Sequence, residues 1–369
     1  MIMNYVIWNL FMVISLANVN WGFYAHRIIN QQAVFSLPPE LLKFYKHHID
    51  YLQEHAVDPD KRRYASEFEA IRHYIDLDHW GQFPFENLTR NFRMDVKHHL
   101  QWTLKKNDDL TPVKVILDGQ QLRWIYGAQV LGSVSTAQFD SIYQYYIWNR
   151  YYEQPWTINT SQLYENDAFQ LDFIVEDGLS LHGILPYFLP TIQANLTKAF
   201  ENNDLKKILK LSAEIGHYIA DATVPLHTTE NYNGQLTGQK GIHAFWETQI
   251  PELLLESHFN LWAEPAKYIR SIDEYFWKIV LDSHFLVPSV FEKERKVRNR
   301  FTEAEQYCYD WRNNQLTKIN CQNLIKAFYD SLKGQVDDRM RFAITAVASS
   351  WLTAWTDAGR PPLTFEKLD

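Results

Sequence analysis

The sequence lacks any cluster of basic residues. Its 369 residues include 36 Lys and Arg against 44 Asp and Glu, which gives a net charge of −8 and a pI of about 6.0. Proteins that hold long duplex nucleic acid present a basic patch or stripe to the phosphates. The composition therefore argues against a stable nucleic-acid complex. A small phosphodiester remains compatible as a substrate, because bound dications would supply their own positive field.

The chain also lacks a long apolar segment. Residues 5–17 form an apolar run of 13 residues, which is too short to span a bilayer and is typical of the central part of a signal peptide. Residues 1–20 carry no charge, and residues 17–20 depart from the usual cleavage pattern of small residues. The alternative is a buried N-terminal helix. We predict a signal peptide over residues 1–20, a secreted or periplasmic mature protein, and no transmembrane segment in that mature chain.

Cysteine is scarce, with only Cys308 and Cys321. In an exported protein these two residues could close a short disulfide loop around Asn313 and Asn314. The alternative is a pair of buried free thiols, and the sequence leaves both open. The motif H-E-x-x-H is absent as well, which disfavours a metalloprotease of that type.

Repeats, low-complexity tracts and clear linkers are also missing, and 46% of the residues are hydrophobic. This composition suffices for one large core. Apolar residues recur at helical spacing over much of the chain. We therefore predict an all-α fold, with residues 21–369 as a single mainly helical domain with long loops. The expected helices cover residues 38–53, 90–106, 205–224, 268–286, 289–311 and 336–357.

Three segments fit this pattern less well. Residues 113–117 form a short β-like run, and residues 120–152 are compatible with two helices or with a helix and a long loop. Residues 153–180 are polar and predict a surface loop or cap.

Potential metal ligands are concentrated between residues 211 and 256. His217 and Asp221 are four residues apart, so a helix would place both side chains on one face, with Cβ atoms roughly 5–6 Å apart. Pro225 should end that helix, and His227 follows directly. A second short helix would carry His243 and Glu247, again four apart. The alternative for each pair is a solvated helix face without a ligand.

Imidazole and carboxylate groups suit zinc, which binds nitrogen at about 2.0–2.1 Å and oxygen at about 2.0–2.2 Å. The combination H-x3-D-x5-H followed by H-A-x-W-E resembles the trinuclear zinc superfamily of bacterial phospholipases C and single-strand-specific nucleases. Mature chains of that family begin with a Trp whose amino and carbonyl groups bind zinc. Trp21, directly after the expected leader, and His26 match this start.

The resemblance also covers Asp58 and His73, because the family has an Asp some 14–15 residues before a His of this kind. Asp60 is the nearby alternative to Asp58. The full set of ligands that the resemblance implies is Trp21, His26, Asp58, His73, His217, Asp221, His227, His243 and Glu247. The resemblance further implies that residues 21–369 are a catalytic domain with long loops around a zinc cleft that holds three zinc ions. It implies that metal-activated water attacks a phosphodiester and that Asp58 accepts the proton of that water.

The resemblance leaves the substrate open. Glu247 and the short interval from His227 to His243 are closer to the phospholipase branch, and two cysteines are fewer than the nucleases carry. We therefore expect a phospholipase C-like hydrolase, active as a monomer on phospholipid head groups. A single-strand-specific endonuclease or 3′-nucleotidase is the alternative within the family. A secreted zinc-binding protein without catalysis is the alternative outside enzymes.

Overall fold

The computed structural model describes residues 23–106, 109–144, 148, 157–159, 173–312, 315–363 and 365. Trp21 and the predicted signal peptide lie outside these residues. The chain forms two compact units. The helical unit comprises residues 23–59, 191–226 and 231–369, and the sheet unit comprises residues 60–190 and 227–230.

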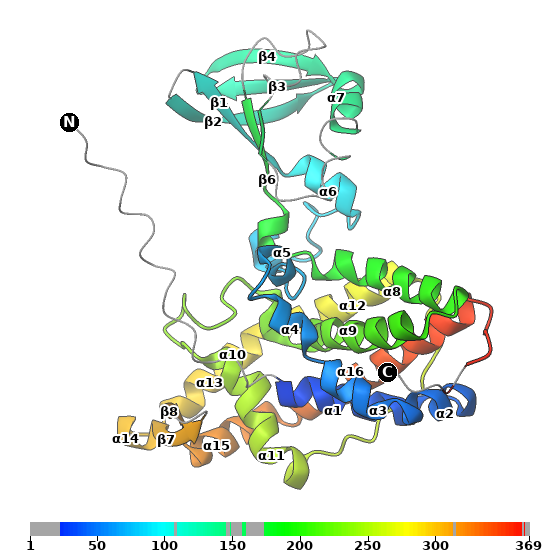
Figure 1. Ribbon diagram of the computed structural model, residues 1–369. Helices are drawn as coiled ribbons and strands as arrows, with labels where there is room; N and C mark the ends of the chain where they lie inside the picture. Colours follow the sequence, from blue (N-terminus) through cyan, green and yellow to red (C-terminus); the bar gives the residue numbers. More distant parts are fainter. Residues whose placement is uncertain are drawn as a thin grey trace. The chain divides into compact units, whose positions relative to one another are not determined.

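Helix α9 (Leu205–Thr223) is the centre of the helical unit (Figure 1). The Asp204 side chain caps its first turn by accepting a hydrogen bond from Lys207 N (3.2 Å), and the helix ends two residues before Pro225, as predicted. From Ser212 to Thr223 every residue is buried, as expected of a helix that is enclosed on all sides. Its neighbours are α1 (Phe23–Ala33), α3 (Ile49–His55), α12 (Ile272–His284) and α16 (Gln335–Asp357).

A second part of the helical core lies around α11, α13 and α15, where Phe245 packs on Phe328 with ring centroids 4.6 Å apart. Further described helical segments are α2 (Pro39–His47), α4 (Asp58–Arg62), α8 (Leu185–Glu201), α10 (Ile242–Ala244), α11 (Ile250–His258), α13 (Val287–Arg298), α14 (Glu303–Gln306) and α15 (Gln322–Leu332), with single turns at Val34–Ser36 and Pro225–Thr228 and a π-helical turn at Phe245–Gln249.

The sheet unit contains a six-stranded antiparallel sheet in the order β4-β3-β2-β1-β6-β5. Figure 1 labels β1, β2, β3, β4 and β6 of this sheet. Trp102 pairs with Val113 on one side and with Val175 on the other. Trp102, Trp124 and Phe173 are buried against one another with ring centroids 5.2–5.7 Å apart. The strands are β1 (Leu100–Lys106), β2 (Asp109–Asp118), β3 (Gln121–Tyr126), β4 (Gln129–Ser135), β5 (Thr157–Asn159) and β6 (Phe173–Asp177). Short helical segments accompany them: α5 (Glu67–Ala70), α6 (Phe92–His98), α7 (Thr136–Ile142), Leu77–Trp80 and Ser180–His182.

The prediction of an all-α fold is therefore wrong, and the fold is mixed α and β. The helix predicted over residues 90–106 ends at His98, and β1 follows. The reason is that the spacing of the apolar residues in this segment is compatible with a helix and with a strand. Val96, Leu100 and Leu104 are four residues apart, which aligns side chains on a helix but also places them on one face of a strand, where the period is two.

The next segment differs as well. The β-like run at residues 113–117 is confirmed as part of β2, but neither alternative for residues 120–152 holds, since β3, β4 and α7 occupy the described part. Gly119 and Gly127 adopt positive φ (61° and 58°) in two-residue turns between the strands. Such turns require residues that tolerate this conformation. Residues 153–180 contain β5 and β6 instead of only a loop.

The predicted helix at residues 289–311 is also too long. Helix α13 ends at Arg298, and a hairpin of β7 (Tyr307–Arg312) and β8 (Gln315–Asn320) follows. The Cys308–Cys321 disulfide closes this hairpin, with Cα atoms 4.9 Å apart. Among the described residues, no helix has the length and hydropathy needed to cross a membrane.

Replacing both cysteines by Ser is expected to lower the free energy of unfolding by roughly 2–3 kcal/mol, because the loop between two residues with a sequence separation of 13 is no longer closed in the unfolded chain. Urea unfolding of the two proteins measures the difference. Wild type kept in a reductant serves as the control, since it should unfold at the same urea concentration as the variant. Equal stability of the oxidised wild type and the variant would show that the disulfide adds nothing.

Candidate metal centre

Three buried side chains from separate segments of the helical unit meet at one point. His26 comes from α1, Asp221 from α9, and Glu247 from a π-helical turn (Phe245–Gln249). His26 Nε2 lies 3.4 Å from Asp221 Oδ1 and 3.4 Å from Glu247 Oε1. The three side chains offer ligand atoms within 4.8 Å of one another, and they are 3%, 1% and 9% exposed. This group could hold a metal ion.

The distances fit metal ligands better than hydrogen bonds. Charge-assisted hydrogen bonds between nitrogen and oxygen measure about 2.7–2.9 Å. Two ligands of a tetrahedral zinc ion, each about 2.0–2.1 Å from the metal, are about 3.4 Å apart. His26 matches that separation twice, and His217 Nε2 lies 3.3 Å from Asp221 Oδ2. The donor set is therefore spaced for a cation. Because Asp221 turns its two oxygens to two different imidazoles, it could serve two ions.

A backbone hydrogen bond orients His217. Its Nδ1 lies 2.9 Å from the Ala56 carbonyl oxygen. That carbonyl can only accept, so Nδ1 carries the hydrogen, and Nε2, which faces Asp221, is the ring atom that could bind a metal. The His217 ring also stacks on His26, with centroids 4.0 Å apart. Complete burial of His217 excludes the alternative in which it forms a solvated pair with Asp221.

Close approach of α1 to α9 brings the two imidazoles together. Gly216 permits it, because a Cβ atom at this position would lie 1.9 Å from Asn30 Oδ1. Asn30 is fully buried, and its Nδ2 donates to Ala213 O (3.0 Å) and Leu52 O (3.3 Å). Sequence reasoning missed both residues. A Gly directly before a ligand His inside a helix was the available signal.

His243 and Glu247 form the second pair at a spacing of four. His243 Nε2 lies 2.7 Å from Glu247 Oε2, which is a hydrogen-bond distance. Gly241 precedes this pair with φ of 93°, and the backbone then continues through α10 into the π-helical turn. Single π-helical turns are rare in proteins, and many of those known lie at functional sites. Glu247 thus faces His243 with one oxygen and His26 with the other.

Asp58, predicted as a ligand and as the proton acceptor, lies at the start of α4 in the helical unit. Its Oδ2 lies 2.5 Å from His55 Nδ1, and its side chain is 29% exposed. Asp58 belongs to none of the potential ligand groups among the described residues. Its role remains a prediction.

His73 and His227 lie in the sheet unit. His227 Nδ1 donates to the His73 carbonyl oxygen (2.7 Å), and Ile75 N donates to the His227 carbonyl oxygen (2.9 Å). Asp60, the alternative to Asp58, places Oδ1 3.8 Å from His73 Nδ1. Glu69, which sequence reasoning missed, places Oε1 3.7 Å from His73 Nε2. Its spacing of four from His73 was the signal that could have revealed it.

The structure thus distributes the predicted ligands between the units. His26, His217, Asp221, His243 and Glu247 lie together in the helical unit, whereas Asp58 contacts His55 there. His73 and His227 lie together in the sheet unit. Trp21 lies outside the described residues.

A second polar cluster in the sheet unit surrounds Asp76. Its N donates to the His182 carbonyl oxygen (2.8 Å), its Oδ2 lies 3.5 Å from His182 Nδ1, and the His182 ring stacks on His79 at 3.4 Å. Burial, and then the neighbouring carboxylates of Asp78 and Glu230, raise the pKa of Asp76 to about 7. An aspartate in the unfolded chain has a pKa of about 3.9.

Asp76→Asn is therefore expected to stabilise the protein more at high pH than at low pH. The raised folded-state pKa means that wild type loses stability as the pH rises from about 4 to about 7, whereas the amide does not titrate. Urea unfolding across this range, with a chelator present, measures the effect. Asp109→Asn, at the exposed start of β2, is the control. A difference that does not change with pH would contradict the expectation.

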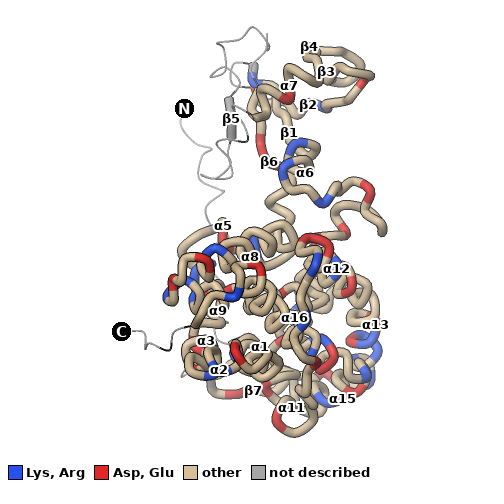
Figure 2. Tube along the Cα trace, turned by 90° about the vertical axis from the view of Figure 1, so that its right-hand side faces the viewer, with Lys and Arg blue, Asp and Glu red and all other residues tan. Residues whose placement is uncertain are grey.

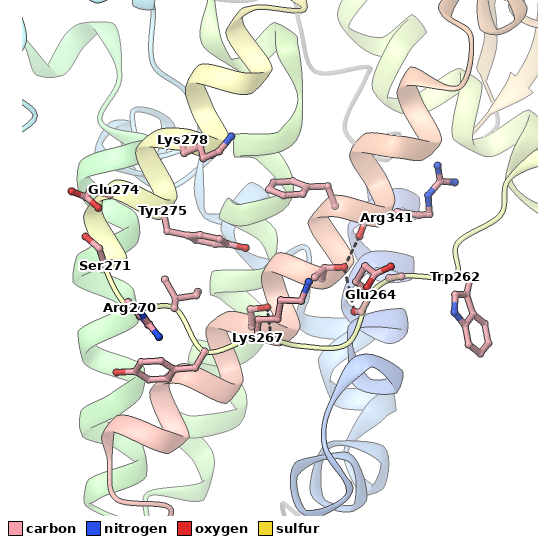
Figure 3. A pocket seen from close by; sticks show the side chains of 15 residues that line it. Trp262, Glu264, Lys267, Arg270, Ser271, Glu274, Tyr275, Lys278 and Arg341 are labelled. Carbon is pink, nitrogen blue, oxygen red and sulfur yellow. Dashed lines mark hydrogen bonds between the residues drawn. The ribbon is translucent and has the colours of Figure 1, made fainter.

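A pocket of about 690 Å³ lies elsewhere in the helical unit (Figure 3). The coil from Trp262 to Ser271 borders it together with α12 and α16, and Tyr275 and Lys267 are among its lining residues. None of the predicted metal ligands lines it. The pocket is therefore not the metal centre.

Comparison of the chain with profiles of known protein families, with curated protein sequences and with solved structures gives no match. The features that bear on function are therefore the ligand spacing in the sequence and the geometry of the buried His26, Asp221 and Glu247 group.

Proposed function

We propose that the chain is an exported zinc-dependent phosphodiesterase that hydrolyses phospholipid head groups in the manner of a phospholipase C. The observation that carries the proposal is the buried group of His26, Asp221 and Glu247, whose nitrogen–oxygen separations of 3.4 Å match neighbouring ligands of one metal ion. Zinc suits this mixture of imidazole and carboxylate, whereas magnesium and calcium prefer oxygen alone.

The negative charge of two buried carboxylates supports a divalent ion beside His26. Asp221 and Glu247 are buried carboxylates, and burial of charge is costly unless it is compensated. A zinc ion held here would supply a Lewis acid for the phosphoryl oxygens and would lower the pKa of water toward 7. The protein itself orients the side chains that would bind the zinc ion. The Ala56 carbonyl fixes the tautomer of His217, and the two oxygens of Glu247 hold His243 and face His26.

The remaining assignments depend on the sequence resemblance. The resemblance adds four ligands, which are the amino group of Trp21 and the side chains of Asp58, His73 and His227. It also implies three zinc ions instead of one. It also favours phospholipids over single-stranded nucleic acid, through Glu247 and the short interval between His227 and His243. The net charge of −8 agrees with that preference, since proteins that track single strands use a positively charged groove.

Metal analysis combined with parallel assays tests the proposal. The exported protein is expected to begin at Trp21, to contain zinc, and to hydrolyse a soluble phosphodiester such as bis(4-nitrophenyl) phosphate. Phosphatidylcholine should be cleaved faster than single-stranded DNA. A chelator should stop hydrolysis, and added zinc should restore it. Zinc without hydrolysis of any of the three substrates would instead indicate a binding protein, and preferential cleavage of DNA would indicate a nuclease.

A further inference from the structure

The hairpin β7–β8 exposes an unusual set of large apolar side chains. Tyr309 is 66% exposed, Trp311 71% and Leu316 56%. Trp311 pairs with Leu316, and Tyr309 pairs with Lys318. Paired residues share a face, and residues two apart along a strand share it too. All four side chains therefore lie on one face, which we call the aromatic face.

The base of this hairpin is firmly attached to the helical unit. Arg298 of α13 donates to Tyr307 Oη (3.4 Å) and to Asn320 Oδ1 (3.3 Å), and Asn320 Nδ2 donates to Gln249 Oε1 (2.8 Å). The Cys308–Cys321 disulfide joins the strands at the same end. Anchoring at the base leaves Tyr309, Trp311 and Leu316 on the outer part of the hairpin, at the edge of the helical unit (Figure 1).

The residue types of the aromatic face favour a membrane surface as its partner. Trp and Tyr combine an apolar ring with a polar atom and are enriched where a membrane meets water. Lys318, whose Nζ lies 3.6 Å from the centre of the Tyr307 ring, adds a cation that can reach lipid phosphates. Exposed apolar side chains gathered in this way mark a surface that binds something.

The size of the face argues against a protein partner. A stable protein interface uses about 20–30 residues on each side. The aromatic face offers four side chains, those of Tyr309, Trp311, Leu316 and Lys318, because hydrogen bonds hold the next pair on the same face, Tyr307 and Asn320, to the helical unit. A lipid surface needs no matching shape. The charge of the hairpin agrees, since residues 307–320 contain two basic residues, Arg312 and Lys318, and one acidic residue, Asp310, in a chain with a net charge of −8. Figure 2 marks the basic and acidic residues along the Cα trace.

We propose that the aromatic face inserts into the interfacial region of a phospholipid surface and holds the protein there. The inference deepens the proposed function and rests on it, because an enzyme that cleaves lipid head groups must reach aggregated substrate. Tyr309 and Trp311 leave water, Leu316 contacts the upper acyl chains, and Lys318 contacts the phosphates.

Sedimentation with phosphatidylcholine vesicles, with and without phosphatidylserine, tests the inference on the full mature protein. The double variant Tyr309→Ala/Trp311→Ala is expected to bind vesicles roughly ten- to a hundredfold more weakly, because two aromatic side chains no longer leave water. Hydrolysis of vesicle phosphatidylcholine should fall by a similar factor. Hydrolysis of bis(4-nitrophenyl) phosphate should stay unchanged, since neither residue lies among the predicted metal ligands.

Trp262→Ala is the matched control. Trp262 is 88% exposed but belongs to the coil at the rim of the pocket (Figure 3), so its loss should leave vesicle binding intact. Equal vesicle binding by wild type and the hairpin variant overturns the inference, as does an equal loss in the Trp262 variant. Failure of the proposed function is distinguishable, because wild type would then cleave no phosphodiester, whatever its binding to vesicles.

Discussion

His217→Ala is expected to remove zinc from the protein and to lower phosphodiester hydrolysis by more than about a hundredfold, because loss of an outer partner of a metal ligand already costs ten- to a hundredfold. His217 is completely buried, its Nε2 faces Asp221 Oδ2 at 3.3 Å, and the Ala56 carbonyl fixes its orientation. An alanine at this position supplies no donor. Metal content per chain and turnover of a soluble phosphodiester measure the two effects.

His258→Ala is the control for this experiment. His258 is an exposed residue at the end of α11 and belongs to no potential ligand group among the described residues. Its loss should change neither zinc content nor turnover. Full activity and full zinc content in the His217 variant would refute the assignment of the metal centre to this helix.

Gly216→Ala is expected to lower the free energy of unfolding by about 1–3 kcal/mol, the usual cost of forcing an additional group into a packed core. The sign of the effect is informative, since Gly→Ala inside a helix otherwise stabilises by roughly 1 kcal/mol. At Gly216 the new Cβ would meet Asn30 Oδ1 at 1.9 Å and Asn30 Cγ at 2.8 Å. The clash should outweigh the helix preference and move α1 away from α9. Zinc affinity should therefore fall together with stability.

A double-mutant cycle with Asn30→Ala identifies the cause. The three atoms nearest to the added Cβ all belong to Asn30, so the double variant should be less destabilised than the sum of the single variants by about 0.5–3 kcal/mol. Urea unfolding of the four proteins provides the values. Gly132→Ala in β4 is the control for a position with room for a side chain, because among the described residues no atom beyond its chain neighbours lies within 4 Å of the added Cβ. Additive effects in the cycle would show that Asn30 does not limit position 216.

Local patterns predicted the parts of the site that lie within one helix. The spacing of His217 and Asp221, and that of His243 and Glu247, is a property of a single segment, and both pairs are in contact in the structure. The end of α9 before Pro225 and the long helix α16 were likewise readable from the residues. The approach of His26 to Asp221 and Glu247 could not be read in this way, because it depends on how α1 packs against α9.

The sequence did not predict the six-stranded sheet, because its strand β1 pairs with a segment, β6, that is distant along the chain. Leu100 and Leu104 fit a helix and a strand equally well, and only the pairing of β1 with β6 decides between them. Trp102 faces Val175, more than seventy residues later in the chain. No local signal announces a partner at that distance. In the same way, Glu69 and Asp60 became visible as neighbours of His73 only once the fold of the sheet unit was known.

Anomalous X-ray diffraction at the zinc absorption edge, from crystals of the exported protein, would locate the zinc ion bound by His26, Asp221 and Glu247. We expect an anomalous peak about 2.0–2.2 Å from His26 Nε2, Asp221 Oδ1 and Glu247 Oε1. A map without a peak at this point, with the imidazole instead hydrogen-bonded directly to the two carboxylates in zinc-replete protein, would contradict this expectation.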